Sequence, residues 1–160
     1  MKVAIIYTSV TGNTRDLVDT INQIFLRHSF NVEVFSVTQF PYLNQLNRFD
    51  AIVVGTYTWG DGDVPMEMKE LFHAFEKQDV KSVTTGIVGT GDSFYPKFCG
   101  AVDEFRDMLY VQTNLAATLK IELVPQLLDL SRCERFVMSM ILRIERMQEE
   151  RKKQDRFLYS

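Results

Sequence analysis

Residues 3–14 read VAIIYTSVTGNT and join two different patterns. The first, Val3–Tyr7, is a continuous apolar run rich in β-branched residues, which is typical of a strand buried on both faces of a sheet. The second, residues 8–14, is a turn dense in hydroxyl and amide side chains around one glycine, and it leads into a segment of helical spacing. A strand, a turn and a helix in this order predict the first unit of an α/β protein with a parallel sheet.

The same alternation continues along the chain. The first helix is expected over about 14–29, because apolar residues recur at core spacing: Leu17, Val18, Ile21, Ile24 and Phe25. Further strands are expected at 32–35, 51–55, 86–89 and 119–123, and further helices at about 65–75, 100–109 and from 131 to 146 or beyond, with a mostly irregular connection over 37–49. Five such units predict a doubly wound, five-stranded parallel sheet with helices on both faces.

Length and composition indicate one globular domain, since the 160 residues are 46% hydrophobic and 24% charged. We expect this domain to span residues 1–148, and residues 149–160 to form a charged tail or an extension of the last helix. The net charge of −3 is uneven, because residues 1–130 hold 10 Lys and Arg against 16 Asp and Glu, and residues 131–160 hold 8 against 5. The acidic body argues against nucleic-acid binding.

Several other classes of protein are not expected either. No apolar run is long enough for a membrane span and no cleavage site follows the first residues, so a cytoplasmic protein without membrane contact is predicted. Cys99 and Cys133 belong to no CxxC or metal-ligand spacing and are expected to remain reduced thiols. His28 and His73 lie in helical segments without a carboxylate–serine partnership, which indicates surface or capping residues. Neither a catalytic residue nor a metal site is expected.

The turn after the first strand is a candidate phosphate site. A helix start offers unpaired backbone N–H groups and a partial positive charge, and hydroxyl and amide side chains add further donors. A plain N-cap is the alternative, but a cap uses one or two such residues, whereas five of these seven are hydroxyl or amide residues. Neither GxxxxGK[ST] nor GxGxxG is present. The candidate phosphate contacts are Thr8, Ser9, Val10, Thr11, Gly12, Asn13 and Thr14.

Two more loops with unusual composition follow the third and fourth strands. Residues 56–65, TYTWGDGDVP, contain the only tryptophan of the chain, and residues 89–103 read GTGDSFYPKFCGAVD. Trp59 offers a flat aromatic surface to a ligand, although it could instead anchor a glycine-rich turn against the core. Tyr95 could likewise pack only on its neighbours, and Asp92 could only form a turn.

The three loops together resemble those of flavodoxins: T/S-x-T-G-N-T, T-W-G-D-G-x-x-P and G-x-G-D-S-x-Y-x-x-F-C-G-A-V-D, each after the matching strand. The resemblance is densest over residues 2–107 and indicates a short-chain bacterial flavodoxin. It implies the sheet order 2-1-3-4-5 and bound FMN at the switch between strands one and three. Flavodoxins are themselves an example of that switch-point rule, so the placement rests on analogy.

The resemblance also implies roles for residues of the second and third loops. Trp59 and Tyr95 would stack on opposite faces of the flavin, and the peptide after Gly60 would turn its carbonyl toward N5 of the protonated semiquinone. Asp92 would lie near the pyrimidine edge, while Cys99 would pack as a small apolar residue behind its loop. The implied cofactor contacts of these two loops are Thr56, Tyr57, Thr58, Trp59, Gly60, Asp61, Gly62, Gly89, Thr90, Gly91, Asp92, Tyr95, Phe98 and Cys99.

The implied function is a low-potential one-electron carrier with non-covalently bound FMN, in which acidic neighbours (Asp61, Asp63 and Asp92) make the reduced flavin anion costly. The implied partners are a flavodoxin/ferredoxin–NADP reductase-type electron donor and acceptor enzymes, met transiently by a monomer. The alternatives are a flavoprotein activator of manganese ribonucleotide reductase and a flavin-dependent quinone reductase. A receiver domain is excluded because strand three ends in Gly55-Thr56, without a phospho-acceptor aspartate.

Three features depart from the family pattern. The net charge is mild, and Phe94 stands where a small residue is common beside Tyr95. The last helix has a wide apolar face, Phe136, Val137, Met140, Ile141, Ile144 and Met147, which Met138 and Leu142 extend. Most of this face is expected to pack on the core, and a partner or dimer surface is the alternative.

Overall fold

The computed structural model describes all 160 residues, and its centre is a single five-stranded sheet. All strands are parallel, in the order β2-β1-β3-β4-β5, which confirms the predicted fold class and strand order. The strands are β1 (Val3–Tyr7), β2 (Val32–Ser36), β3 (Ala51–Thr56), β4 (Thr84–Gly91) and β5 (Asn114–Glu122).

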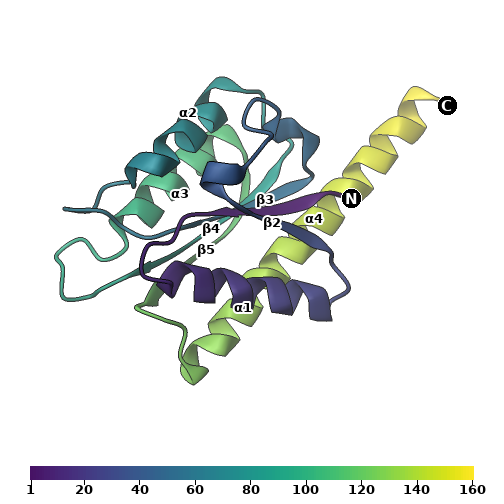
Figure 1. Cartoon of the computed structure of the whole chain (residues 1–160). Helices are drawn as coiled ribbons and strands as arrows, with labels where there is room; N and C mark the ends of the chain where they lie inside the picture. Colours follow the sequence, from purple (N-terminus) through teal and green to yellow (C-terminus); the bar gives the residue numbers. More distant parts are fainter.

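Helices cover both faces of this sheet (Figure 1). They are α1 (Asn13–Arg27), α2 (Lys69–Lys77), α3 (Gly100–Gln112) and α4 (Leu130–Leu158), and short 3-10 turns occur at Val37–Gln39, Leu46–Arg48, Met66–Met68 and Leu127–Asp129. One apolar core lies between the sheet and α2 with α3, and the second lies between the sheet and α1 with α4. The apolar positions that predicted α1 are all buried in the second core.

The central strands are buried on both faces, as their continuous apolar runs predict. Every residue of β3 is buried, and so is nearly every residue of β4. Gly86 of β4 lets α4 pack directly on the sheet, because a Cβ at this position would lie only 2.7 Å from both Met140 Sδ and Phe136 Cζ. The close approach explains why this strand carries glycine at its centre.

Several predicted boundaries were wrong. β5 begins at Asn114 rather than residue 119 and ends before Leu123, whose positive φ of 57° turns the chain out of the strand. β4 extends beyond the predicted 86–89 because Thr84, Thr85 and Thr90 also belong to the ladder. The helix expected from residue 65 begins with a 3-10 turn, and α2 itself starts only at Lys69.

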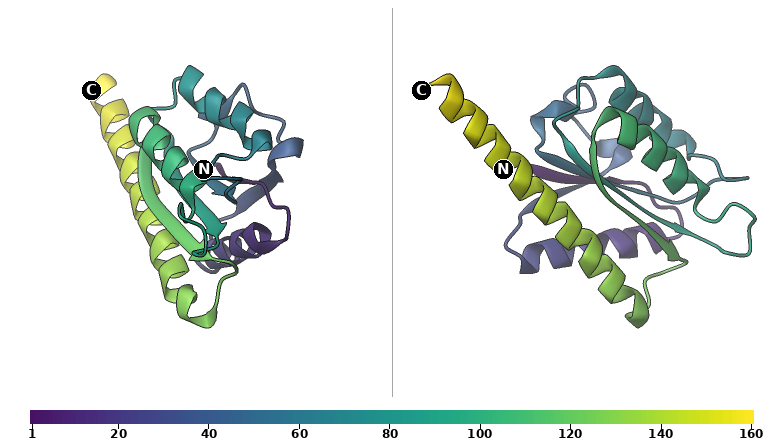
Figure 2. Two further views of the ribbon diagram at one scale, coloured as in Figure 1. Left: turned by 90° about the vertical axis from the view of Figure 1, so that its left-hand side faces the viewer. Right: turned by 180° about the vertical axis from the view of Figure 1, so that it is seen from behind.

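The longest helix, α4, crosses the sheet and continues past its edge. Figure 2 shows its last turns leaving the domain beside the amino ends of the strands, whereas the loops after β3 and β4 extend from the opposite edge. The helical structure continues through residue 158, so most of the charged segment 149–160 is an extension of this helix. No helix of the structure combines the length and the hydropathy that a bilayer span requires.

Candidate functional site

The turn between β1 and α1 leaves several hydrogen-bond donors free. Gly12 is the N-cap of α1 with a φ of 94° and has no side chain to cap the helix; among the first N–H groups of α1, that of Arg15 donates to Ser9 Oγ at 3.3 Å. None of the backbone N–H groups of residues 9–14 donates to a backbone carbonyl. The side chains of Thr11 and Asn13 also have no partner within the protein, whereas the buried Thr14 hydroxyl is paired with Thr90 Oγ1 at 2.8 Å. The turn can therefore receive an anion on neutral donors.

This turn borders a hollow of about 200 Å³, which we call the inner hollow. Its wall comes from four segments, at the ends of β1, β3, β4 and β5, that are distant in sequence but meet at the carboxyl edge of the sheet. The lining residues are Val10, Thr11, Asn13, Thr14, Tyr57, Thr58, Thr90, Gly91, Asp92 and Leu123. Lys and Arg are absent from this lining, so a bound anion would depend on hydrogen bonds and the helix start.

A second hollow, the outer hollow, has a volume of about 300 Å³ and adjoins the first, because both are lined by Thr58, Gly91 and Asp92. It lies between the loops after β3 and β4, and Tyr95 contributes the aromatic part of its wall. Its other lining residues are Gly60, Asp61, Gly62, Pro96, Lys97 and Cys99. The two hollows together lead from the start of α1 to the outer loops.

The loop after β3 is a tight hairpin. Trp59 and Asp63 exchange two backbone hydrogen bonds of 2.9 Å and 2.7 Å, and the turn between them is closed by Gly60 and Gly62, both with positive φ. Gly62 also lies against the neighbouring loop, since a Cβ there would be 2.7 Å from Lys97 Cδ. The Trp59 side chain is 63% exposed, so the hairpin presents it outward instead of anchoring it in the core.

The loop after β4 is organised by Asp92. Its Oδ1 accepts the Phe94 N–H at 2.9 Å, and its backbone carbonyl accepts the Tyr95 N–H at 3.1 Å. Asp92 therefore forms a turn, the structural alternative for this residue, and it lines both hollows as well. Tyr95 is 65% exposed and Phe94 is almost fully exposed.

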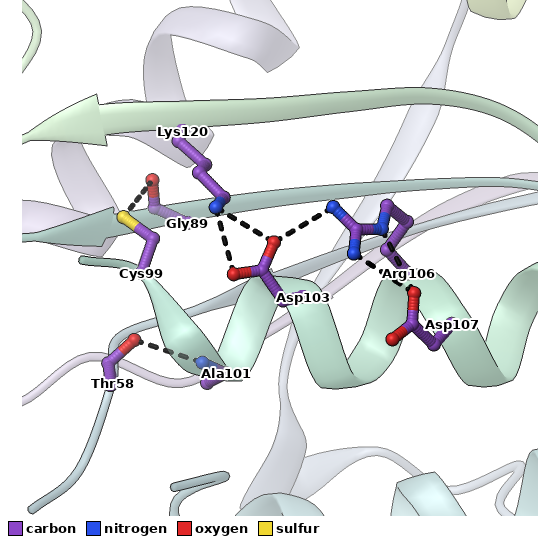
Figure 3. Close-up of polar contacts among 8 residues, drawn as sticks. All are labelled: Thr58, Gly89, Cys99, Ala101, Asp103, Arg106, Asp107 and Lys120. Atoms are coloured by element: carbon purple, nitrogen blue, oxygen red, sulfur yellow. Dashed lines mark hydrogen bonds and ion pairs between the residues drawn. The ribbon is translucent and has the colours of Figure 1, made fainter. Parts of the chain in front are cut away.

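The start of α3 fixes the base of the site (Figure 3). Ala101 N–H donates to the Thr58 hydroxyl at 3.2 Å, which joins the two outer loops. Cys99 is buried behind its loop, with Sγ 3.9 Å from the Gly89 carbonyl, and burial raises the pKa of this thiol to about 12. This burial confirms the expected packing role and leaves the thiol unreactive at neutral pH.

Charges near the outer hollow are partly balanced. Lys97 Nζ lies 3.6 Å from Asp61 Oδ2, which offsets one of the three acidic charges expected beside the ligand. Deeper in the structure, Asp103 accepts from Lys120 and Arg106, as Figure 3 shows. Asp63 and Asp92 form no ion pair, so they remain the acidic groups of the outer loops.

Not every predicted contact residue lines the two hollows. Thr56 and Gly89 are buried behind them: the Thr56 hydroxyl donates to the Tyr57 carbonyl at 2.7 Å, and Gly89 lies against Val102. Trp59 lines a separate hollow of about 510 Å³ together with Tyr57, Asp63 and Glu67, so its ring and that of Tyr95 do not face the same space. The remaining predicted residues outside both linings are Thr8, Ser9, Gly12 and Phe98.

Sequence reasoning also missed residues that shape the site. Glu67 accepts hydrogen bonds from Thr8 Oγ1 at 2.7 Å and from the Tyr57 hydroxyl at 2.6 Å. Lys97 lies over Gly62, and Leu123 lines the inner hollow. Only the sheet order could have indicated Glu67, because it places the segments after β1 and β3 side by side.

The two histidines lie away from these hollows. His28 is the C-cap residue of α1, and its backbone N–H donates to the carbonyls of Ile24 and Phe25. His73 is exposed on α2, with Nδ1 3.0 Å from the Glu76 carboxylate. Both positions agree with the expected capping and surface roles.

Comparisons with known proteins agree with this geometry. Residues 5–112 match the family model described as Flavodoxin. The probable flavodoxin 1 of Bacillus subtilis (strain 168) is 32% identical over 154 residues, which cover 94% of this chain and 96% of that protein. The crystal structure of oxidised flavodoxin 1 from Bacillus cereus aligns with a TM-score of 0.80 and 30% identity, over 88% of this chain and 97% of that one.

A larger protein contains a similar module. The NADPH sulfite reductase flavoprotein alpha-component of Vibrio vulnificus (strain CMCP6) is 29% identical over 77% of this chain, which corresponds to 20% of that protein. The family model covers more than half of the chain, and the Bacillus subtilis relative matches over nearly all of it. The chain therefore belongs to the flavodoxin family, small flavoproteins that bind FMN and carry electrons.

Proposed function

We propose that this chain holds FMN with the phosphate on residues 8–14 and the ring system between the loops after β3 and β4. The observation that carries the proposal is the pair of adjoining hollows, which lead from the free N–H groups at the start of α1 to Tyr95 and the turn Gly60–Gly62. A ligand with an anionic group joined to a flat aromatic ring fits this arrangement: the anion would lie at the start of α1 and the ring in the outer hollow.

The phosphate end depends on neutral donors. The free N–H groups of residues 9–14 and the unpaired side chains of Thr11 and Asn13 can surround a dianion, and the partial positive charge of the α1 start favours it. The Thr14 hydroxyl is already paired with Thr90, so we assign it to fixing the loop. Without a cation at this position, the site distinguishes phosphate by geometry more than by charge.

The ring end depends on exposed aromatic surface. When bound, FMN supplies the one-electron chemistry, and the chain's residues hold it and set its electrostatic surroundings. Trp59 and Tyr95 provide the two aromatic side chains, and each is largely exposed. Because Trp59 lines a separate hollow, its side chain has to turn toward the hollow of Tyr95 for both to contact one ring system. The unpaired carboxylates of Asp63 and Asp92 disfavour added negative charge nearby, while Lys97 reduces the contribution of Asp61. This balance favours a low potential.

The partners in this proposal are an NADPH-linked flavodoxin/ferredoxin reductase-type donor and acceptor enzymes that meet the chain transiently. A similar module lies within a protein named as an NADPH sulfite reductase flavoprotein, which supports a donor of this kind. We further propose that the chain acts as a cytoplasmic monomer, with residues 1–148 as the FMN-binding domain. The ribonucleotide reductase activator and the quinone reductase are not favoured.

Titration of the FMN-free protein with FMN, FAD and riboflavin, followed by flavin fluorescence, tests the proposed site. We expect FMN to bind most tightly. The phosphates of FAD are bonded to adenosine, so FAD has no free terminal phosphate, and riboflavin has no phosphate group at all. Trp59→Ala and Tyr95→Ala should each weaken FMN binding by about twofold to tenfold or more, since stacking adds about 0.5–1.5 kcal/mol beyond burial.

Tyr110→Ala is the matched control, since Tyr110 is an exposed aromatic residue on α3 that lines none of the described hollows. Its FMN affinity should equal that of the wild type. Unchanged affinity in both the Trp59 and the Tyr95 variants would show that the ring binds elsewhere.

A further inference from the structure

One carboxylate joins the first two loops of the site. Glu67 Oε1 accepts a hydrogen bond from Thr8 Oγ1 at 2.7 Å and another from the Tyr57 hydroxyl at 2.6 Å. Thr8 is the first residue of the turn that leads to α1, and Tyr57 is the first residue after β3. A single oxygen atom thus connects the phosphate end to the loop that carries Trp59.

Glu67 is itself held in place by the core. It lies in the 3-10 turn Met66–Met68, and Met68 next to it is fully buried in the core with Leu71 of α2. Thr8 is tied in a second way, because its backbone N–H donates to the Gly55 carbonyl at 3.0 Å. The connection therefore runs between rigid elements and not between two mobile side chains.

The connection also borders the ligand space. Tyr57 and Thr58 line the inner hollow opposite residues of the α1 turn, so a shift of Tyr57 changes the wall that faces Thr11 and Asn13. No ion pair includes Glu67, which leaves its charge to be stabilised by the two O–H donors. The negative charge of a carboxylate near an anion site weakens binding of the anion. The position of Glu67 here is therefore better explained by the two hydrogen bonds that it accepts.

We propose that Glu67 is a positioning residue that couples the two ends of the site, so that filling the phosphate end improves binding of the ring system. This inference rests on the proposed function, because it takes the inner hollow as the phosphate end. Because the connection runs between rigid elements, a displacement of Thr8 caused by an anion at residues 8–14 is passed through Glu67 to Tyr57 and the ring loop. FMN carries both the phosphate and the ring system, so the coupling would raise its affinity.

The coupling can be measured by supplying the two parts of FMN separately. Riboflavin is titrated into the FMN-free protein with inorganic phosphate or with chloride at equal ionic strength, and binding is followed by quenching of flavin fluorescence. In the wild type, phosphate should raise riboflavin affinity at least about fivefold, the lower end of common coupling energies. In Glu67→Ala, which removes both hydrogen bonds, the increase should fall below about twofold.

Two further variants separate position from charge. Glu67→Gln keeps an oxygen that accepts both O–H groups, so it should retain the coupling although the charge is lost. Tyr57→Phe removes only the hydrogen bond between Glu67 and the ring loop, and this variant should lose the coupling. If Glu67→Ala does not fold, Tyr57→Phe tests the role of Glu67 in its place. Glu104→Ala is the matched control: Glu104 lines the same hollow as Glu67 but bonds to neither loop, so coupling should be unchanged.

The possible results distinguish this inference from the proposed function. Full coupling in both Glu67→Ala and Tyr57→Phe overturns the role of Glu67, and so does a wild type that binds FMN but shows no effect of phosphate on riboflavin. A wild type that binds neither FMN nor riboflavin overturns the proposed site and this inference together.

Discussion

The Tyr57 hydroxyl and the Glu67 carboxylate affect each other's protonation. Burial, followed by the hydrogen bond and the charge of Glu67, raises the pKa of Tyr57 from 10.0 to about 12. For Glu67, burial alone would raise the pKa, but the hydrogen bonds donated by Tyr57 and Thr8 outweigh it and the pKa is lowered. Both shifts favour the same pair, a neutral phenol beside an ionised carboxylate.

These shifts predict how the pair contributes to stability. The folded pKa of Tyr57 is higher than the unfolded one, so its contribution is complete below pH 10.0 and is lost as pH rises through about 12. The folded pKa of Glu67 is lower than the unfolded one, so its contribution is present above the unfolded pKa and is lost as pH falls.

Ultraviolet titration of tyrosinate measures the first shift. The chain has 6 tyrosines, and the difference between wild type and Tyr57→Phe should show one group that ionises near pH 12. In Glu67→Gln this group should ionise closer to pH 10.0, because the negative charge is gone. A difference curve centred at pH 10.0 in the wild type would contradict the hydrogen bond between Tyr57 and Glu67.

The residues of the site differ in how far the sequence alone predicts their roles. Trp59 and Asp92 were singled out because each lies in a loop whose own composition is unusual. Glu67 carries no such local signal, and its partner Thr8 is 59 positions away. Lys97 was missed for a similar reason, since its position over Gly62 depends on how two loops approach each other. Contacts between loops, unlike loop chemistry, require the fold.

At the scale of elements, the apolar pattern predicted β1, β2 and β3 to within one residue, β4 less well and the edge strand β5 poorly. β3 is a continuous apolar run, and its predicted boundaries differ from the structure by one residue. In β5, Asn114 and the small residues after it are only half-buried, and they form a strand because they pair with Thr84 and its neighbours on β4. Pairing of this kind leaves no period in the sequence of β5 itself.

The packing of α4 on β4 predicts a large effect of one methyl group. Gly86→Ala would place Cβ 2.7 Å from Met140 Sδ and Phe136 Cζ, both of which belong to buried side chains. Overpacking of this kind should lower the free energy of unfolding by about 1–3 kcal/mol. Urea denaturation of the FMN-free protein measures the change.

A second substitution checks the cause of this loss. Phe136→Leu removes the ring that the new methyl group would meet, so Gly86→Ala should cost less in that background than in the wild type. Equal costs in the two backgrounds would mean that contact with the Phe136 ring does not determine the loss, which would then come from Met140 or from the backbone.

At the scale of the whole molecule, the two ends of the sheet serve different purposes. The hollows and the three loops lie at the carboxyl ends of the strands, whereas α4 leaves the domain near their amino ends (Figure 1). Arg151 marks the departure: its guanidinium lies 2.8 Å from Asp50 Oδ1 and donates to the Ser82 carbonyl at 3.0 Å. Asp50 and Ser82 precede β3 and β4, so one side chain joins the helix to the start of both strands.

Residues 152–160 lie beyond this contact and are exposed. The basic segment is thus remote from the proposed FMN site, and its charge has little influence there across the width of the domain at physiological salt. It follows that changes in this segment should leave FMN affinity unaffected, while changes at Arg151 should act on the stability of the helix end.

Arg151→Ala should therefore release the end of α4. Because the Asp50 pair is partly exposed, the loss in global stability should be small, up to about 1 kcal/mol. The local effect should be larger: amide hydrogen exchange over the turn before residue 151 should approach the fast exchange expected for residues 152–158 in the wild type. Lys152→Ala, which removes the same charge from an exposed position without a partner, should leave that turn protected. Equal exchange in the two variants would show that the helix end is held by packing alone.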